Sequence, residues 1–282
     1  MTTAFLILSI SSAVLQNGIF NSVCKKHLKT NDDIYKFNIF VYAVCILIFG
    51  ILTLNGSLSL YTVLLGVLFG VVTALSNLYK MLALSKGPMH ITLLITTSSM
   101  IIPTLSGVFF GEKFSLLKLL FVFVLIYFIY LSIGKTKEGK TNKLWGIYCL
   151  LAFVFIGAIG VIQKVHQTSV YKDEISGFLF VSFFVSLIIS FLRVKEKRSF
   201  EFKKRLIPLA IISGVCIFTM NFLNLKLSGL LPSQLFFPLV NGSSIVLTSI
   251  MSVVLFKEHL SKRQTIGLIG GIISLIAICF AN

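Results

Sequence analysis

The chain has 282 residues, 56% of them hydrophobic, and its 25 Lys and Arg residues outnumber 9 Asp and Glu residues. Soluble domains are roughly 45–50% apolar, so a mean hydropathy of +0.98 excludes an ordinary soluble fold. The basic residues lie in short segments between uncharged runs, with no basic stripe interleaved with aromatic residues. This pattern excludes nucleic acid as the partner and favours the anionic surface of a membrane.

Charge-free runs recur along the first half, and each is long enough to cross a bilayer, which takes roughly 20 apolar residues. No Lys or Arg precedes Lys25 and no small-residue cleavage site follows, so the first run is expected to be a spanning helix, not a removable signal. The expected helices are 2–24, two within 37–79 separated by an Asn-Gly-Ser turn, one from Pro88 to Gly111, and one from about 115 to 134.

The basic segment 135–143 is expected to link this half to a second set of five helices. These cover about 144–163, 175–192, 206–226, 232–256 and 264–280. The predicted fold is therefore an all-α membrane protein with ten transmembrane helices. Basic residues concentrate in the odd-numbered loops, so the positive-inside bias places those loops in the cytoplasm and both termini outside.

The two halves repeat the same landmarks at nearly constant offsets of 139, 144 and 146 residues. The matched pairs are Lys25 with Lys164, Asn77 with Asn221, Pro88 with Pro232, Thr97 with Asn241, Glu112 with Glu258, and Ser115 with Ser261. A unit with an odd number of spans inverts when it is repeated, so the halves are expected to form two inverted five-helix repeats around a central site.

Uncharged polar residues lie at matching depths in the expected helices. Thr73, Asn77 and Lys80 share one face of helix three, Asn221, Asn224 and Ser228 share one face of helix eight, and clusters occur at 96–99 and 241–244. Interhelical hydrogen bonding explains any single one of these residues, whereas the matched clusters favour a cavity wall. The residues predicted to contact a substrate are Gln16, Asn77, Thr97, Ser98, Asn221, Asn241 and Ser244.

The nine acidic residues lie outside the expected hydrocarbon centres, which argues against the intramembrane carboxylate typical of a proton-coupled drug pump. Glu112 and Glu258 each lie three residues before a serine at a helix start. Capping by Ser115 and Ser261, with the carboxylates near positive helix ends, is one interpretation, and proton carriage is the other. Five separated cysteines and four histidines at helix ends form no metal or redox motif, so we predict no metal site, no cofactor and no catalytic residue.

Two further features concern helix ends and breaks. Pro238 followed by Asn241-Gly242 predicts a bend or a short unwound turn in helix nine. Lys80 and Lys226 lie near helix ends, so snorkelling to the interface is one expectation, and a countercharge for a carboxylate or phosphate on the cargo is the other.

The pattern resembles the drug/metabolite transporter superfamily, in particular its ten-helix EamA-like members. The resemblance is carried by Lys25 after helix one, Ala83-Leu84 to Gly87-Pro88, Glu112, Glu258 and the glycine-rich helix ten. It implies EamA-like repeats over 1–134 and 144–282 and a pocket lined by helices one, three, four, six, eight and nine. Family members commonly have a proline about thirteen residues before the glutamate that corresponds to Glu112 or Glu258, and this proline is absent from both halves. Ten-helix members are usually drawn with cytoplasmic termini, against the charge bias, so the orientation stays open.

We therefore predict a secondary transporter of a small polar or amphipathic metabolite, such as an amino-acid-like compound, in a bacterial cell membrane, working as a uniporter or exchanger. Its expected partners are the small-molecule substrate and membrane lipids, with no nucleic acid, and it is expected to be a monomer or homodimer. The alternative functions are an integral-membrane enzyme acting on lipid head groups and a lipid-flipping accessory subunit.

Overall fold

The computed structural model describes residues 2–28, 30–54, 56–87, 89–113, 115–132, 143–195, 204–256 and 261–281. Within these ranges the regular elements are all helices. They are α1 (Thr2–Lys26), α2 (Asn31–Thr53), α3 (Leu60–Lys86), α4 (Met89–Ser98), α5 (Ile101–Ser106), η1 (Gly107–Phe110), α6 (Leu116–Ser132), α7 (Lys143–Gln167), α8 (Ile175–Arg193), η2 (Lys204–Leu206), α9 (Ile207–Leu230), α10 (Ser233–Phe256) and α11 (Lys262–Phe280).

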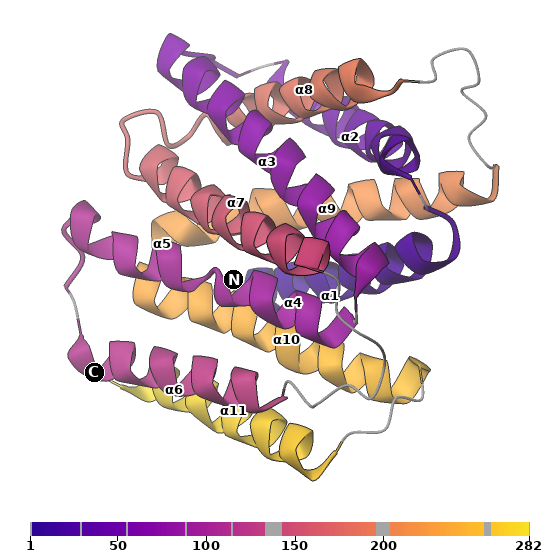
Figure 1. The fold of residues 1–282 in the computed structure, drawn as a ribbon. Coiled ribbons are helices and arrows are strands. Elements are labelled where there is room, and N and C mark those ends of the chain that lie inside the picture. Colours follow the sequence, from indigo (N-terminus) through magenta and orange to yellow (C-terminus); the bar gives the residue numbers. More distant parts are fainter. Residues whose placement is uncertain are drawn as a thin grey trace.

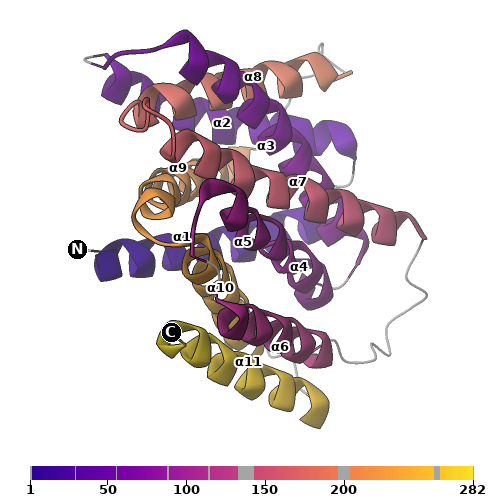
Figure 2. The same ribbon diagram turned by 90° about the vertical axis from the view of Figure 1, so that its left-hand side faces the viewer.

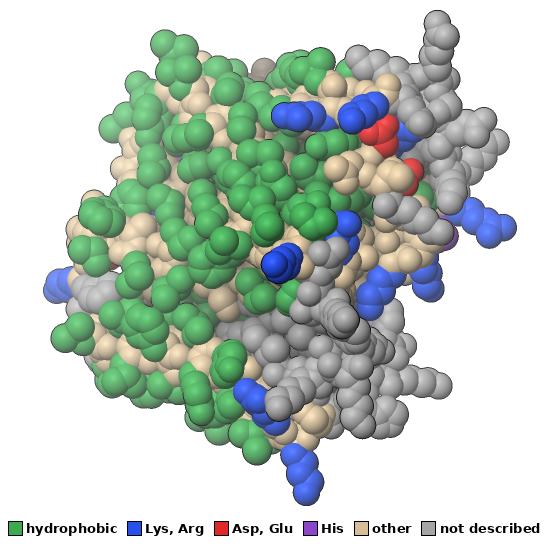
Figure 3. All heavy atoms as spheres, in the orientation of Figure 1, with side chains coloured by type: hydrophobic (Ala, Val, Ile, Leu, Met, Phe, Trp, Pro, Cys, Tyr) green, Lys and Arg blue, Asp and Glu red, His purple; other side chains and the backbone are tan. Residues whose placement is uncertain are grey.

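The helices have the length and composition of membrane spans. Among the described residues, α1, α2, α3, α7, α8 and α9 are each long and apolar enough to cross a membrane, and α6 and α11 contain shorter apolar segments. Hydrophobic side chains cover much of the molecular face in Figure 3, and the Lys and Arg side chains visible there lie mostly in its right half. The predicted all-α membrane architecture is confirmed at this level.

Helices from the two halves of the chain pack against each other (Figure 1). The helix α2 packs on α8, α6 on α11, α3 on α7 and α8, and α1 on α9. Figure 2 shows α1 and α7 running in opposite directions across the molecule. A cluster of buried aromatic residues joins the halves, for example Phe49 stacked on Phe183 with 5.8 Å between ring centroids.

Local sequence explains where several helices start and stop. Thr30 caps α2 in a capping box, because its side chain accepts from the Asp33 N–H and the Asp33 side chain accepts from the Thr30 N–H. Gly111 ends η1 with φ +69°, a left-handed conformation that suits glycine. Ser115 caps α6 as predicted, since its hydroxyl accepts from the Lys118 N–H at 3.3 Å. Glu258 lies outside the described residues.

The short unwound turn expected near Pro238 in helix nine is wrong. The helix α10 runs without interruption through Pro238, whereas the expected helix four is divided into α4, α5 and η1. At this break Pro103 has no N–H to donate to the Ser99 carbonyl, which instead accepts from the Ile102 N–H at 3.0 Å. The hydroxyl of Thr96 bonds to the carbonyl of Thr92 at 2.9 Å, a local bond that often bends helices.

The helices α3 and α8 approach each other closely at Gly66 and Gly70. A Cβ atom at Gly70 would lie 2.4 Å from the carbonyl oxygen of Ser182. The Ser186 hydroxyl donates to the carbonyl of Gly70 at 2.8 Å and so links the two helices. Cys24, Cys45, Cys149 and Cys216 are buried free thiols.

Candidate functional site

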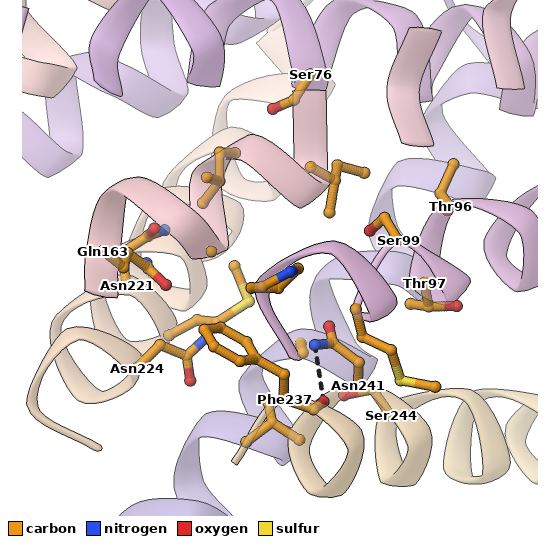
Figure 4. Close-up of a pocket in the computed structure, with 18 of the residues that line it drawn as sticks. Ser76, Thr96, Thr97, Ser99, Gln163, Asn221, Asn224, Phe237, Asn241 and Ser244 are labelled. Atoms are coloured by element: carbon orange, nitrogen blue, oxygen red, sulfur yellow. Dashed lines mark hydrogen bonds between the residues drawn. The ribbon is translucent and has the colours of Figure 1, made fainter. Parts of the chain in front are cut away.

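A cavity of about 140 Å³ with a partly polar wall lies between the two halves of the chain (Figure 4). Its wall comes from α1, α3, α4, α5, α7, α9 and α10 and the turn between α4 and α5. These are the segments that correspond to expected helices one, three, four, six, eight and nine. The wall combines amide and hydroxyl groups with apolar surface from residues such as Ile159, Phe236 and Phe237.

Six of the seven predicted contact residues line this cavity: Gln16, Asn77, Thr97, Asn221, Asn241 and Ser244. Ser98 does not, and its neighbour Ser99 takes that place. Successive residues on a helix are rotated by about 100°, so a prediction of the cluster 96–99 does not establish which of its members faces the cavity.

The cavity wall also includes residues outside that predicted set of seven. Asn17 and Gln163 belong to none of the predicted polar faces or clusters, although they are the chain neighbours of Gln16 and Lys164. Thr73, Lys80 and Asn224 belong to the polar faces recognised on expected helices three and eight. Extending those faces to all their members would have found these three residues.

Two asparagines of the wall, both from the second half of the chain, use their amide groups in the same way. Asn221 Nδ2 donates to the carbonyl of Ile217 at 2.9 Å. Asn241 Nδ2 donates to the carbonyl of Phe237 at 3.0 Å, the bond drawn as a dashed line in Figure 4. Each bond fixes the amide nitrogen against its own helix four residues earlier. The amide oxygen is thereby held as an acceptor at the cavity wall.

Asn77 has a structural bond as well as a place in the wall. Its Nδ2 donates to the Tyr42 hydroxyl at 2.9 Å, and Tyr42 is fully buried. Removing the Asn77 amide would leave that hydroxyl without this partner, at a cost of about 1–3 kcal/mol. Substitutions at Asn77 therefore test stability together with substrate contact.

Two hydroxyl groups in the wall are buried without a hydrogen-bond partner among the residues that the structure describes. They are Thr73 Oγ1 on α3 and Ser244 Oγ on α10, in residues that are 4% and 3% exposed. A buried polar group normally has a partner, because leaving it unpaired costs free energy. The two hydroxyls are therefore suited to bind a polar group that enters the cavity.

Lys80 brings a positive charge to the same wall. Its Nζ donates to Asn17 Oδ1 at 2.8 Å and lies 5.8 Å from the centroid of the Phe20 ring. The expectation that Lys80 snorkels to the interface is wrong, because the Asn17 amide and the cavity hold its ammonium inside the protein. Lys226 lies elsewhere, with Nζ 4.5 Å above the ring of Phe222.

A second polar cluster lies where α7 and α9 end and α10 begins. Lys164 forms an ion pair with Glu112 and donates to the carbonyl oxygen of Ser228 at 2.8 Å. Glu112 also accepts from the backbone N–H of Ser233 at 2.7 Å and from its hydroxyl at 3.1 Å. Phe236, about one helical turn after Ser233 in α10, lines the cavity, so this cluster lies next to the cavity.

Comparisons with known proteins agree with this architecture. Residues 143–280 match the model of the EamA-like transporter family, which confirms the resemblance over that part of the chain. No curated protein sequence matches the chain. One solved crystal structure of a protein is similar over 99% of this chain and 99% of its own, with a TM-score of 0.70 and 13% sequence identity. At that identity the similarity concerns the fold alone.

Proposed function

We propose that this multi-pass membrane protein is a secondary transporter. The proposal starts from the match between residues 143–280 and the EamA-like transporter family of the drug/metabolite transporter superfamily. The proposed cargo is a small polar or amphipathic metabolite, and the proposed location is the cell membrane. The observation that carries the proposal is the cavity between the halves, whose wall combines the polar side chains of Asn221, Asn241 and Ser244 with apolar surface.

The proposed architecture is a pair of inverted repeats of five helices each. Expected helices two and seven occupy equivalent places in the two halves, and their counterparts α2 and α8 pack on each other, as do α6 and α11. The helices α1 and α7, also counterparts, run in opposite directions. These relationships are the ones expected for two units related by a twofold axis in the membrane plane.

The proposed mechanism is alternating access, in which one end of the cavity closes as the other opens. Lys164 at the end of α7 is buried and paired with Glu112, with side chains 7% and 14% exposed. Its counterpart Lys25, at the end of the oppositely directed α1, is exposed. This difference supports a state in which the Lys164 end is held shut, and the pair would break when that end opens.

Uptake into proteoliposomes tests the proposal. The purified chain is reconstituted and loaded with a panel of unlabelled metabolites, and exchange against their labelled forms is measured. We expect exchange of at least one compound, and Asn241→Leu and Ser244→Ala are expected to reduce its rate at least tenfold. Ser11→Ala is the matched control, because Ser11 is exposed on α1 and does not line the cavity.

Two results would overturn the proposal: no compound exchanged faster than in protein-free liposomes, or both cavity variants exchanging at the wild-type rate. The same vesicles carrying a fluorescent phospholipid report the alternative function. Lipid movement between leaflets that both cavity variants leave intact would favour a lipid-flipping role.

A further inference from the structure

Among the described residues that line the central cavity, Lys80 is the one charged side chain. Its ammonium has three N–H groups. One of them donates to Asn17 Oδ1 at 2.8 Å, and the Phe20 ring lies 5.8 Å away. No carboxylate of the described residues forms an ion pair with it. The cavity therefore presents a positive charge that contacts a neutral amide and an aromatic face.

An ammonium held inside a membrane span in this way is costly, because low-dielectric surroundings destabilise a charge that has no counter-ion. An ionisable residue within a membrane span is by default a functional residue with a partner to be named. Neither the amide of Asn17 nor the ring of Phe20 carries a negative charge. The missing counter-ion is best supplied by the cargo.

Neighbouring groups extend this site. Thr73 precedes Lys80 by seven residues, two turns of α3, and so shares its face of the helix. Its hydroxyl is buried without a hydrogen-bond partner among the described residues, as is that of Ser244 on α10. An ammonium and two hydroxyl donors match the oxygen atoms of a carboxylate or phosphate. Phe236 and Phe237 give the same cavity an apolar part.

The charge belongs to one half of the chain only. An offset of 144 residues places Asn224 at the position equivalent to Lys80, and Asn224 Oδ1 accepts from the Ser9 hydroxyl at 2.5 Å. The second half thus satisfies this position with a neutral hydrogen bond. A lysine is not required for packing there, which favours a binding role for Lys80.

We infer that Lys80 is an anion subsite, and that the cargo is a small organic anion whose carboxylate or phosphate pairs with the Lys80 ammonium and accepts from Thr73 and Ser244. The inference rests on the proposed transport function and specifies its substrate class. Carboxylate and phosphate share the recognition chemistry, so the experiment below includes both.

Thermal unfolding of the purified chain in detergent tests the subsite, since a ligand that binds the folded state raises its melting temperature. The probes are propionate, propionamide, inorganic phosphate and tetramethylammonium at equal ionic strength. We expect propionate or phosphate to stabilise the wild type and the other two probes to leave it unchanged. Lys80→Gln should weaken the anion response at least tenfold in apparent Kd, and Lys80→Arg should retain most of it.

Lys226→Gln is the matched control, because it also removes a lysine from a span but lies outside the cavity wall. It should respond like the wild type. Asn17→Asp tests the anion subsite even if the Lys80→Gln protein does not fold. A carboxylate at this position would give the Lys80 ammonium a permanent counter-ion. The apparent Kd for the anion should then rise at least tenfold. Equal responses to propionate and propionamide, or an undiminished anion response in Asn17→Asp or in folded Lys80→Gln, would overturn the inference.

The vesicle exchange assay separates this inference from the proposed function. Exchange of neutral compounds at equal rates by wild type and Lys80→Gln would overturn the anion subsite and leave transport standing. Anion-dependent stabilisation that is lost in Lys80→Gln, without exchange of any compound, would overturn transport and leave the subsite standing.

Discussion

The carboxylate of Glu112 accepts a hydrogen bond of 2.7 Å from the backbone N–H of Ser233, the first residue of α10. The sequence suggested that Glu112 lies near the positive end of the helix that follows it in the chain. The structure instead directs it to a helix start 121 residues away, while Ser115 caps α6. With Lys164 as its ionic partner, Glu112 therefore joins the two halves of the protein.

The first prediction concerns this ion pair. Removing one partner of a buried pair leaves an uncompensated charge, so Glu112→Ala should reduce the free energy of unfolding by about 3–5 kcal/mol. Glu112→Ala combined with Lys164→Ala should cost less than the sum of the two single substitutions, because the lone charge is gone. Thermal unfolding of the wild type, the two single variants and the double variant in one detergent gives this double-mutant cycle. Additive effects would mean that the two groups do not interact.

The second prediction concerns the contact between α3 and α8. A Cβ atom at Gly70 would lie 2.4 Å from the backbone oxygen of Ser182, which cannot move independently of its helix. Gly70→Ala should therefore destabilise the fold by about 1–3 kcal/mol through overpacking. Gly146→Ala is the control, since a Cβ atom there meets nothing within 4 Å. It should melt at or above the wild-type temperature, and a Gly70→Ala protein that does the same would contradict the packing.

Sequence alone predicted the features that depend on residues close together in the chain. Charge-free runs gave the span positions to within a few residues for most helices, because length and apolar character decide whether a segment crosses a bilayer. The polar faces on expected helices three and eight also follow from helical spacing alone. Both lie at the cavity in the structure, through Asn77 and Asn221.

What the sequence did not predict depends on contacts between distant residues. The partner of Lys80 is Asn17, 63 residues away, and nothing near Lys80 indicates an amide there. The break in expected helix four depends on which N–H takes up the Ser99 carbonyl beside Pro103, and Pro238 shows that a proline alone does not decide this. The choice of Ser99 over Ser98 depends on the rotation of a broken helix.

The third prediction concerns pH and the loop before α8. Burial raises the pKa of Glu174, but hydrogen bonds from Thr62, Ser59 and Ser57 outweigh it and lower the pKa from 4.5 to about 2. The Ser59 N–H and hydroxyl donate at 2.9 and 2.8 Å. Because the folded-state pKa is depressed, the stabilisation is fully present above about pH 4.5 and is lost as the pH falls towards 2.

Glu174→Gln should therefore melt below the wild type at pH 7, and the difference should shrink between pH 4.5 and 2. Melting curves of both proteins at pH 7, 4 and 2.5 give the comparison. Asp173→Asn serves as a control because Asp173 is the exposed neighbouring carboxylate. A Glu174→Gln deficit that is constant over this range would mean that the charge of Glu174 does not stabilise the loop.

The last prediction concerns the proposed opening of the Lys164 end. Ser228 is fully buried and its carbonyl accepts from Lys164, so a thiol at this position is shielded while the Glu112 pair holds. In a cysteine-free background, Ser228→Cys should react slowly with a charged methanethiosulfonate reagent in detergent. Adding Glu112→Ala should raise that rate at least tenfold, because the closed state loses an interaction that the open state lacks. Lys25→Cys, at an exposed position, should react quickly with or without Glu112→Ala. Equal Ser228→Cys rates in the two backgrounds would show that the ion pair does not control access to this end.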